Sequence, residues 1–275
     1  MAGSVHTFDD SVAYERFMGR WSRAVGATFL TWVAPPAGAR WLEVGCGTGI
    51  FTELLLDTCS PEAVFAVDPA QAQIEHACRQ PVSQRAHFQA ADAQALPFPD
   101  ATFDVVASAL VINFIPDRPL AVSEMRRVGR AGCVVASYVW DFAEELSPSW
   151  PLRLGLRKFG AKVPDLPGAR DSSRGALHSL FEQIGLEGIT TRSIDVTLPY
   201  SDFDDFWQAQ TPSYSPTTRI IAAMTTSERT KLMETVRERL PVRPDGGIEY
   251  RARANAIKAR VPSAATAVHS AAILA

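Results

Sequence analysis

The stretch Arg40-Trp-Leu-Glu-Val-Gly-Cys-Gly-Thr-Gly-Ile-Phe51 decides how the rest of the chain is interpreted. Its residues 41–44 are mostly apolar, as is typical of a buried parallel strand. Three glycines follow at alternate positions: Gly45, Gly47 and Gly49. They predict a tight turn, and a helix is expected from Phe51. Because glycine has no Cβ, a ligand can lie directly against the backbone N–H groups of such a turn, beside the helix N-terminus.

The spacing of the glycines indicates which ligand is bound. A dinucleotide-binding turn has the pattern G-x-G-x-x-G, and Ile50 stands where its third glycine would fall. Here the turn is G-x-G-x-G, with Glu43 two residues ahead and with Cys46 and Thr48 between the glycines. It resembles the first motif, E/D-x-G-x-G-x-G, of the class I S-adenosylmethionine (SAM)-dependent methyltransferases. The resemblance implies that the turn lies beside the methionine portion of SAM, with Glu43 reaching the site directly or through water.

A second predicted strand, residues 64–68, ends in Asp68, about twenty residues beyond the turn. A carboxylate at that position can accept hydrogen bonds from two ribose hydroxyls. Alternatively, Asp68 caps the following helix, with Pro69 as its first residue. The two interpretations are compatible, and both stay open at this point.

A third predicted strand, residues 86–92, also ends in an acid, Asp92. The methyltransferase resemblance implies that Asp92 lies beside the adenine amino group. It also implies that the backbone N–H of Ala93 meets a nitrogen of the adenine ring. This feature separates SAM binding from nicotinamide binding better than the glycines do.

The fourth predicted strand, residues 103–110, ends in the crevice where open α/β sheets bind ligands, so Ser108 is a candidate cofactor contact. Methyltransferases of DNA and protein amines often carry an Asn/Asp-Pro-Pro-aromatic signature here. This chain has Ser-Ala-Leu-Val-Ile-Asn over residues 108–113 instead, which argues against a base flipped out of nucleic acid as the acceptor. Asn113 contacts cofactor or substrate, or caps a turn.

The string Tyr-Glu-Arg-Phe-Met-Gly-Arg-Trp-Ser, residues 14–22, has apolar residues near helical spacing, which by itself indicates a helix that covers the core. It also resembles the N-terminal lid of the UbiE/type 11 group of small-molecule methyltransferases. The resemblance implies that Tyr14, Met18 and Arg20 close over the cofactor. The Arg20 guanidinium suits the carboxylate of SAM through a bidentate pair.

The acceptor side is expected where the fifth predicted strand, residues 132–140, ends. Two insertions follow, at about residues 141–172 and 200–245, and insertions of this length often form a functional cap. The candidate acceptor-side residues are Asn113, Tyr138, Trp140, Asp141 and Trp207. The aromatic inserts favour an apolar or planar acceptor. The five histidines form no recognisable catalytic pairing, so no catalytic residue is assigned.

The alternation of strands and helices predicts a doubly wound, Rossmann-like α/β fold. Its seven-stranded sheet is mostly parallel, with an antiparallel last strand and helical lid and cap insertions. Residues 1–34 are expected to form lid helices and 35–260 the methyltransferase domain, which carries both insertions. Residues 261–275 are expected to be a tail.

The bulk composition narrows the class of protein. The chain has 275 residues, 47% of them hydrophobic and 21% charged, as in globular domains. A net charge of −3 gives no electrostatic footprint for nucleic acid. Four cysteines without C-x-x-C pairs support neither a zinc site nor a disulfide framework, so no metal is expected. No apolar run reaches bilayer length, and a cytoplasmic enzyme of unknown oligomeric state is expected.

These observations predict a SAM-dependent methyltransferase that acts on a small molecule without a metal and releases S-adenosyl-L-homocysteine. The acceptor atom, oxygen, nitrogen or carbon, is not resolved. One alternative is a SAM-binding protein without transfer activity, which would keep the cofactor residues but lack a productive acceptor pocket. A nicotinamide oxidoreductase is the other, and the missing third glycine counts against it.

Overall fold

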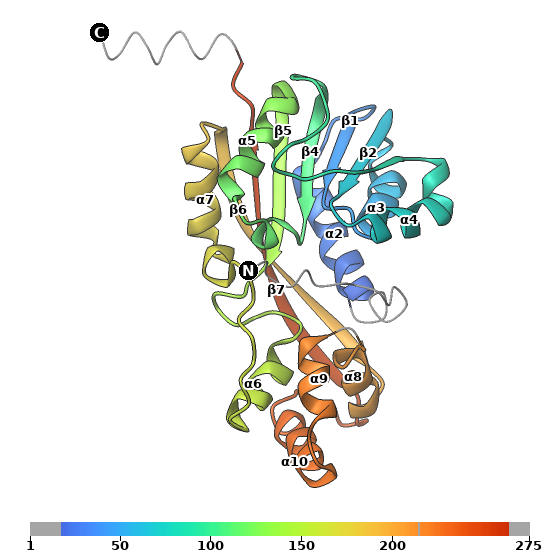
Figure 1. The fold of residues 1–275 in the computed structure, drawn as a ribbon, viewed down its shortest axis with the longest axis vertical. Helices are drawn as coiled ribbons and strands as arrows, with labels where there is room; N and C mark the ends of the chain where they lie inside the picture. The colour runs from blue at the N-terminus through green and yellow to red at the C-terminus, as the bar shows by residue number, and fades with distance from the viewer. Residues whose placement is uncertain (1–17, 214, 264–275) are drawn as a thin grey trace, which may run out of the picture.

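The computed structural model describes residues 18–213 and 215–263 and contains one seven-stranded sheet (Figure 1). The strands are β1 (Arg40–Val44), β2 (Ala63–Asp68), β3 (His87–Ala90), β4 (Phe103–Ala109), β5 (Gly129–Trp140), β6 (Glu187–Tyr200) and β7 (Ile248–Arg260). Their order in the sheet is β3-β2-β1-β4-β5-β7-β6. The strands β1 to β5 are parallel, whereas β7 runs antiparallel to both of its neighbours, β5 and β6. The predicted fold class, with its antiparallel last strand, is confirmed.

Helices cover both faces of the sheet. They are α2 (Arg20–Val33), α3 (Ile50–Cys59), α4 (Gln71–Arg79), α5 (Arg118–Val128) and α7 (Arg174–Gln183). On one face, α2 and α3 bury aromatic side chains, among them Trp21, Phe29 and Phe51, against the strands. On the other face, α5 and α7 contribute Met125 and Phe181 to a second apolar cluster. Burying a side chain of this size stabilises the fold by about 1.5–3 kcal/mol.

The strand β1 is buried because it lies in the middle of this parallel sheet. Trp41 packs into the cluster under α2 and α3, whereas Leu42 and Val44 point to the opposite cluster. Side chains alternate between the two faces of a strand, and both faces of a covered parallel sheet are apolar. This explains why β1 is apolar on both faces apart from Arg40 at its start and Glu43, which is also buried.

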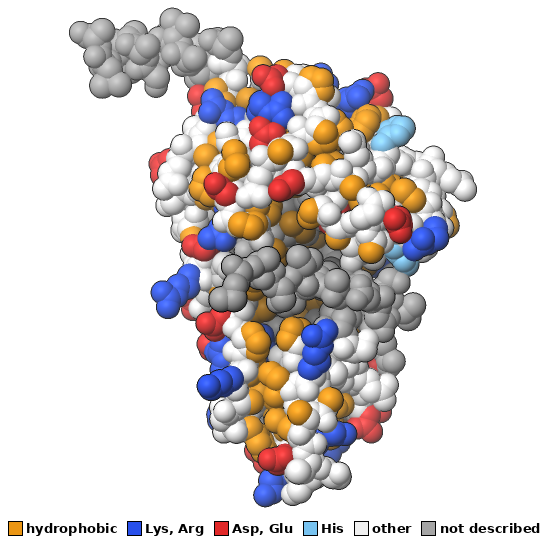
Figure 2. Space-filling model, viewed as in Figure 1, with side chains coloured by type: hydrophobic (Ala, Val, Ile, Leu, Met, Phe, Trp, Pro, Cys, Tyr) orange, Lys and Arg blue, Asp and Glu red, His pale blue; other side chains and the backbone are white. Residues whose placement is uncertain are grey.

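A helical cap extends from one end of the α/β body. It consists of α6 (Trp150–Lys158), α8 (Phe203–Gln210), α9 (Pro216–Ala222) and α10 (Thr226–Arg237). The long hairpin of β6 and β7 runs from the body into this cap, and its pairing continues to Tyr200 opposite Ile248 (Figure 1). The visible face of the cap carries apolar side chains with Lys and Arg among them (Figure 2).

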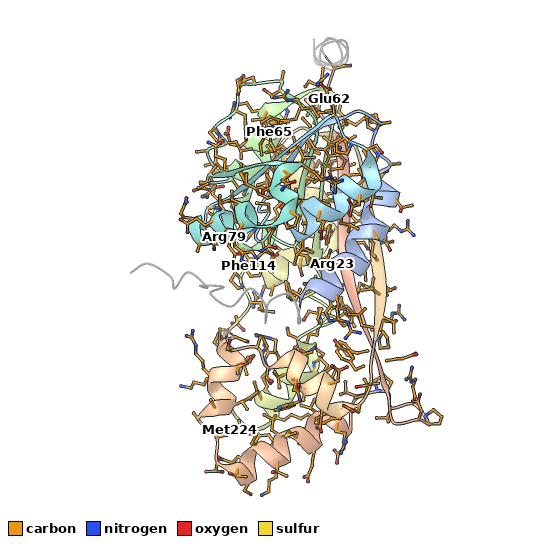
Figure 3. The ribbon with its side chains drawn as sticks, turned by 90° about the vertical axis from the view of Figure 1, so that its right-hand side faces the viewer. Arg23, Glu62, Phe65, Arg79, Phe114 and Met224 are labelled. Atoms are coloured by element: carbon orange, nitrogen blue, oxygen red, sulfur yellow. The ribbon has the colours of Figure 1, made fainter. Side chains whose placement is uncertain are left out.

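Three short 3-10 helices complete the described elements: η2 (Pro81–Gln84), η3 (Ile112–Phe114) and η4 (Ala169–Ser172). In Figure 3, Phe114 lies at the end of the α/β body that faces the cap, and Met224 lies on the cap. The helix η3 therefore occupies the junction between body and cap, directly after β4.

The helical spacing of apolar residues predicts that Leu120 and Cys78 lie on the buried faces of their helices, and both predictions are wrong. The sequence pattern places Leu120 on the inward face of its helix, but 45% of Leu120 is exposed. The buried stripe of α5 is Ala121, Val122, Met125 and Val128. Leu120 lies outside this stripe, in the first turn of the helix. Cys78 is also exposed, because the buried face of α4 consists of Ile74 and Ala77.

Candidate functional site

The glycine turn follows β1, and all three of its glycines have a positive φ: 82° at Gly45, 52° at Gly47 and 87° at Gly49. The carbonyl of Val67 on β2 accepts hydrogen bonds from the N–H groups of Gly45 (2.7 Å) and Cys46 (3.0 Å), which fix the turn. A Cβ at Gly45 would lie 2.5 Å from the side chain of Val111, whereas a Cβ at Gly47 would meet open space. The turn is therefore closely packed at Gly45 and open at Gly47.

Glu43 is a buried carboxylate on β1 beneath this turn. One carboxylate oxygen accepts a hydrogen bond of 2.5 Å from Thr52 Oγ1 on α3. The other oxygen, Oε1, is buried and has no hydrogen-bond partner among the described residues. Burial raises the pKa of Glu43 to about 7, opposed by the Thr52 bond, and the negative charge of Asp68 raises it further. An unpartnered oxygen below an open turn is free to meet a ligand donor.

Asp68 connects the end of β2 with the glycine turn. Its two carboxylate oxygens accept hydrogen bonds from the N–H groups of Gly47 and Ala70, both at 2.9 Å. Burial raises the pKa of Asp68, although both of these bonds act in the opposite direction. The helix α4 begins at Gln71 with Ala70 as its N-cap, so Asp68 and Pro69 precede the helix. The expectation that Asp68 is the N-cap and Pro69 the first helical residue is wrong.

Asp92 lies just after β3 at the same edge of the sheet. Its carboxylate is exposed and accepts hydrogen bonds from the backbone N–H of Gln94 (2.9 Å) and from the Gln94 side chain. The neighbouring Ala93 is buried. Because β1, β2 and β3 are parallel neighbours, Glu43, Asp68 and Asp92 lie along the edge of the sheet formed by the carboxyl ends of these strands.

The end of β4 approaches the turn from the other side. Ser108 is fully buried, and its hydroxyl has no hydrogen-bond partner within the described part of the chain. Leu110 has a positive φ of 62° and donates its N–H to the carbonyl of Tyr138 (2.8 Å). This backbone bend carries the next residue, Val111, onto Gly45. Val111 was missed by sequence reasoning, because the close approach at Gly45 joins residues far apart in the chain.

Asn113, in η3, is buried and connects the body with the first cap insertion. Its Nδ2 donates a hydrogen bond of 3.1 Å to the carbonyl of Pro167. Its Oδ1 is buried and has no partner among residues 18–213 and 215–263. Asn113 therefore positions the insertion next to the end of β4 and retains one unsatisfied acceptor.

The other acceptor-side candidates are packed into the interior. Tyr138 lies in an aromatic cluster, 4.6 Å from Phe29 between ring centroids. Trp140 packs edge-on against Trp21 at 5.9 Å. Asp141 is buried and accepts a hydrogen bond from the N–H of Glu144.

The remaining candidates lie on the helices. Trp207 is half-buried on α8. Met18 is half-buried against the core, and Arg20 donates a hydrogen bond of 2.6 Å to the carbonyl of Pro199 at the end of β6. Its guanidinium also lies over the Tyr200 ring, 5.1 Å from the centroid. Tyr14 lies outside the described residues.

Two hollows accompany the site. A small one of about 120 Å³ lies beside the turn and is lined by Thr48 and Gly49 together with α3 and the end of α4. A larger one of about 360 Å³ lies within the insertion that follows β5. Among the described residues, no group of His, Cys, Asp or Glu is arranged to hold a metal ion. Nor does this part of the chain contain a helix of the length and apolarity that a bilayer span needs.

Comparison with known proteins agrees with this geometry. Residues 42–137 match the family model described as a methyltransferase domain. The chain is 29% identical over 164 residues to the malonyl-[acyl-carrier protein] O-methyltransferase of Serratia marcescens, a match covering 59% of this chain and 62% of that protein. It is 31% identical over 189 residues to the O-methyltransferase cnsE of Penicillium expansum, a match that covers 61% of this chain and 66% of that protein. The chain thus spans less than two thirds of the length of either relative.

The fold also matches solved structures. Phosphoethanolamine N-methyltransferase 2 of Haemonchus contortus, solved in complex with SAM, superposes with a TM-score of 0.58 at 17% identity. The match covers 95% of this chain and 61% of that one. At this identity the similarity concerns the fold alone.

Proposed function

Because residues 42–137 are a methyltransferase domain of the class I SAM-dependent, type 11 kind, we propose that the protein transfers a methyl group from SAM to a small molecule. The observation that carries the proposal is the shared edge of β1, β2 and β3. There an open glycine turn, a buried carboxylate and two further carboxylates lie together.

The residues at this edge fit SAM in their chemistry. Gly47 faces open space, so the cofactor can approach its backbone. Glu43 has an unpartnered oxygen for the amino-acid portion, and Asp68 can accept hydrogen bonds from ribose hydroxyls. Asp92 and the N–H of Ala93 are assigned to the adenine. Cys46, Thr48, Pro69 and Ser108 complete the proposed contacts.

SAM, when bound, supplies a methyl group activated by its sulfonium. The protein's task is then to hold an acceptor in line with that methyl group and to exclude water. We assign this task to residues after β4 and β5 and to the cap, with Asn113, Tyr138, Trp140, Asp141 and Trp207 on the acceptor side. Met18 and Arg20, with Tyr14, are assigned to a lid.

The acceptor is proposed to be a small apolar or planar molecule and not a nucleic acid. Support comes from the aromatic side chains of the insertion, since Phe142 and Trp150 line the larger hollow. Alanine substitutions of Trp140 and Trp207 test the aromatic assignment. Unchanged turnover and unchanged acceptor affinity in both variants would contradict the assignment of these two tryptophans to the acceptor side.

We also propose that the protein works in the cytoplasm. All four of its cysteines are free thiols, as is usual where the redox environment is reducing. Cell fractionation followed by thiol labelling under denaturing conditions, which expose the buried Cys46 and Cys133, would test this. Recovery with the cytoplasmic fraction and four labelled cysteines is expected, whereas disulfide-linked cysteines would contradict it.

The direct test is methyl transfer from methyl-labelled SAM to a panel of small acceptors. Transfer that is abolished by Asp68→Ala, with the fold intact, is the expected result. SAM binding without transfer to any acceptor would favour the alternative of a binding protein without activity. No observation on the present structure favours that alternative.

A further inference from the structure

The larger hollow lies in the insertion between β5 and α7. It has a volume of about 360 Å³, within the range of small-molecule pockets. Two aromatic side chains, Phe142 and Trp150, and two arginines of α6, Arg153 and Arg157, line it. Its walls thus combine planar apolar surface with positive charge.

The hollow adjoins the proposed cofactor site. Gly168 belongs to its wall, and a Cβ there would overlap the carbonyl oxygen of Asn113. Asn113 also donates a hydrogen bond to Pro167, the residue before this glycine. Val111, two residues before Asn113, packs on Gly45 of the glycine turn. The segment after β4 therefore contacts the glycine turn at Val111 and the wall of the hollow at Asn113, two residues later.

The acidic residues around the hollow already have arginine partners. Arg157 lies 3.6 Å from Glu145 and 3.8 Å from Asp165. Asp171 forms an ion pair with Arg118 at 2.5 Å. Each carboxylate in the wall is thus paired with a cation other than Arg153.

Arg153 is different, because it is a buried cation without a counter-ion. Only 6% of it is exposed, and its guanidinium donates a hydrogen bond to the carbonyl of Pro164. Among the described residues, no carboxylate lies within ion-pair distance of it. Burial lowers the pKa of its guanidinium and the charge of Arg157 acts in the same direction, whereas the charge of Asp165, which lies beyond ion-pair distance, opposes them. Burying an unpaired charge destabilises a fold, so a ligand that supplies the missing anion explains its position.

We propose that this hollow binds the acceptor through an oxyanion, a carboxylate or a phosphate, that pairs with Arg153. The guanidinium offers several N–H donors in one plane, which matches both of these groups. The planar or apolar part of the acceptor lies against Phe142 and Trp150. The inference rests on the proposed function, since it names the chemical class of the methyl acceptor.

The test uses three probes of one shape: benzoate, phenyl phosphate and the neutral benzamide. Each is titrated into the full chain with saturating S-adenosyl-L-homocysteine, and binding is followed by calorimetry. At least one of the two anions is expected to bind about tenfold or more tightly than benzamide. Tighter binding of benzoate would indicate a carboxylate acceptor, and tighter binding of phenyl phosphate would indicate a phosphate acceptor.

Variants then locate the anion. Arg153→Met is expected to weaken the anion about tenfold or more. Arg153→Lys keeps a charge but lacks the planar guanidinium, so its affinity for the anion is expected to lie between those of wild type and Arg153→Met. Lys158→Met is the matched control, because Lys158 is exposed on the same helix and does not line the hollow. It is expected to leave binding unchanged. Thermal unfolding of each variant checks that the fold is intact.

Two results would overturn the inference. One is that neither anion binds wild type more tightly than benzamide, and the other is that Arg153→Met binds the anions as tightly as wild type. A parallel SAM titration separates this failure from that of the proposed function. SAM binding by wild type and by Arg153→Met, with no anion preference, would refute the acceptor class alone. Absence of SAM binding by wild type would refute the methyltransferase and, with it, the acceptor role of the hollow.

Discussion

Gly45 and Gly47 show how two similar residues of one turn are required for different reasons. Both have a positive φ, which side chains other than glycine adopt at a cost of about 1–2 kcal/mol. Only Gly45 also lies against Val111. Packing against Val111 therefore leaves no room for a side chain at Gly45, whereas the space beside Gly47 is available to a ligand.

We therefore expect Gly45→Ala and Gly47→Ala to differ. Gly45→Ala adds a clash with Val111 to the backbone cost, so its free energy of unfolding should fall by about 2 kcal/mol more than that of Gly47→Ala. Gly47→Ala should stay folded but lose at least about tenfold in SAM affinity, since its Cβ enters the proposed ligand space. Denaturant unfolding and SAM titration of both variants measure this. Wild-type affinity in Gly47→Ala would contradict it.

Glu43 should make the stability of the protein depend on pH. Its folded pKa of about 7 lies above the ordinary value of 4.5, so between these values the folded state holds a proton that the unfolded chain releases. The stability gained from this proton is complete below pH 4.5 and is lost as pH rises through about 7. A shift of this size corresponds to about 3 kcal/mol.

Comparison with Glu43→Gln isolates this effect, because glutamine does not titrate and the other groups contribute equally to both proteins. We expect the wild-type free energy of unfolding to fall relative to that of the variant between pH 5 and pH 7.5, by up to about 3 kcal/mol. Denaturant unfolding at several pH values measures the difference. Parallel pH curves for the two proteins would show that Glu43 does not titrate in this range.

At the scale of elements, α6 positions Arg153 only because Gly155 allows the helix to pack closely on α10. A Cβ at Gly155 would lie 2.8 Å from Val236 and 3.0 Å from Leu232, both fully buried. The glycine of α7, Gly175, has nothing within 4 Å of the same position. The two helices thus offer a matched pair of substitutions.

Gly175→Ala should stabilise the protein by about 0.5–1 kcal/mol, because alanine favours the helix. Gly155→Ala gains the same helix preference but overpacks the interface with α10, at a cost of about 1–3 kcal/mol. In thermal or denaturant unfolding, Gly155→Ala should therefore be less stable than Gly175→Ala. Equal stability of the two variants would mean that α6 and α10 are not in close contact.

The parallel half of the sheet was predictable from the sequence, because each of its elements carries a local signal. The strand β1, the glycine turn and α3 are contiguous in the chain, and hydrophobic periodicity marks the strands that follow. The family match to residues 42–137 confirms the resemblance on which the SAM assignment rests. The exposed Leu120 shows the limit of periodicity, since an apolar residue one position away from the buried stripe fits the pattern nearly as well.

The packing of the cap could not be predicted from the sequence as fully as the sheet. The two insertions are evident from the loss of strand–helix alternation, but their helices pack through residues distant in sequence, as Gly155 does on Val236. Arg153 illustrates this best. In the sequence it is one basic residue among several, and only the structure shows that it is a buried guanidinium with no acidic partner within ion-pair distance among the described residues. One local signal was available, because Arg153 lies between the buried residues Leu152 and Leu156 of one helix.

At the scale of the whole molecule, the proposed site lies where the α/β body meets the cap. The body supplies the glycine turn and the carboxylates, and the insertion after β5 supplies the hollow. Side-chain hydrogen bonds fix the insertion to the body. Asn255 of β7 donates a hydrogen bond of 3.0 Å to the carbonyl of Ser172, and Asn113 donates one of 3.1 Å to the carbonyl of Pro167. The position of the proposed acceptor site relative to the proposed cofactor site is therefore fixed by the fold.

We propose that SAM binds at the carboxyl ends of β1, β2 and β3. Calorimetric titration of wild type and Asp68→Ala with SAM and with S-adenosyl-L-homocysteine tests it most directly. Removing a carboxylate that hydrogen-bonds the ligand costs about 1.5–3 kcal/mol, which corresponds to a loss of affinity of about tenfold or more. Because Asp68 also accepts a hydrogen bond from Gly47, thermal unfolding must show that Asp68→Ala is folded. We expect tight binding by wild type that weakens at least tenfold in the folded variant, and absence of binding by wild type would show that these strand ends do not bind SAM.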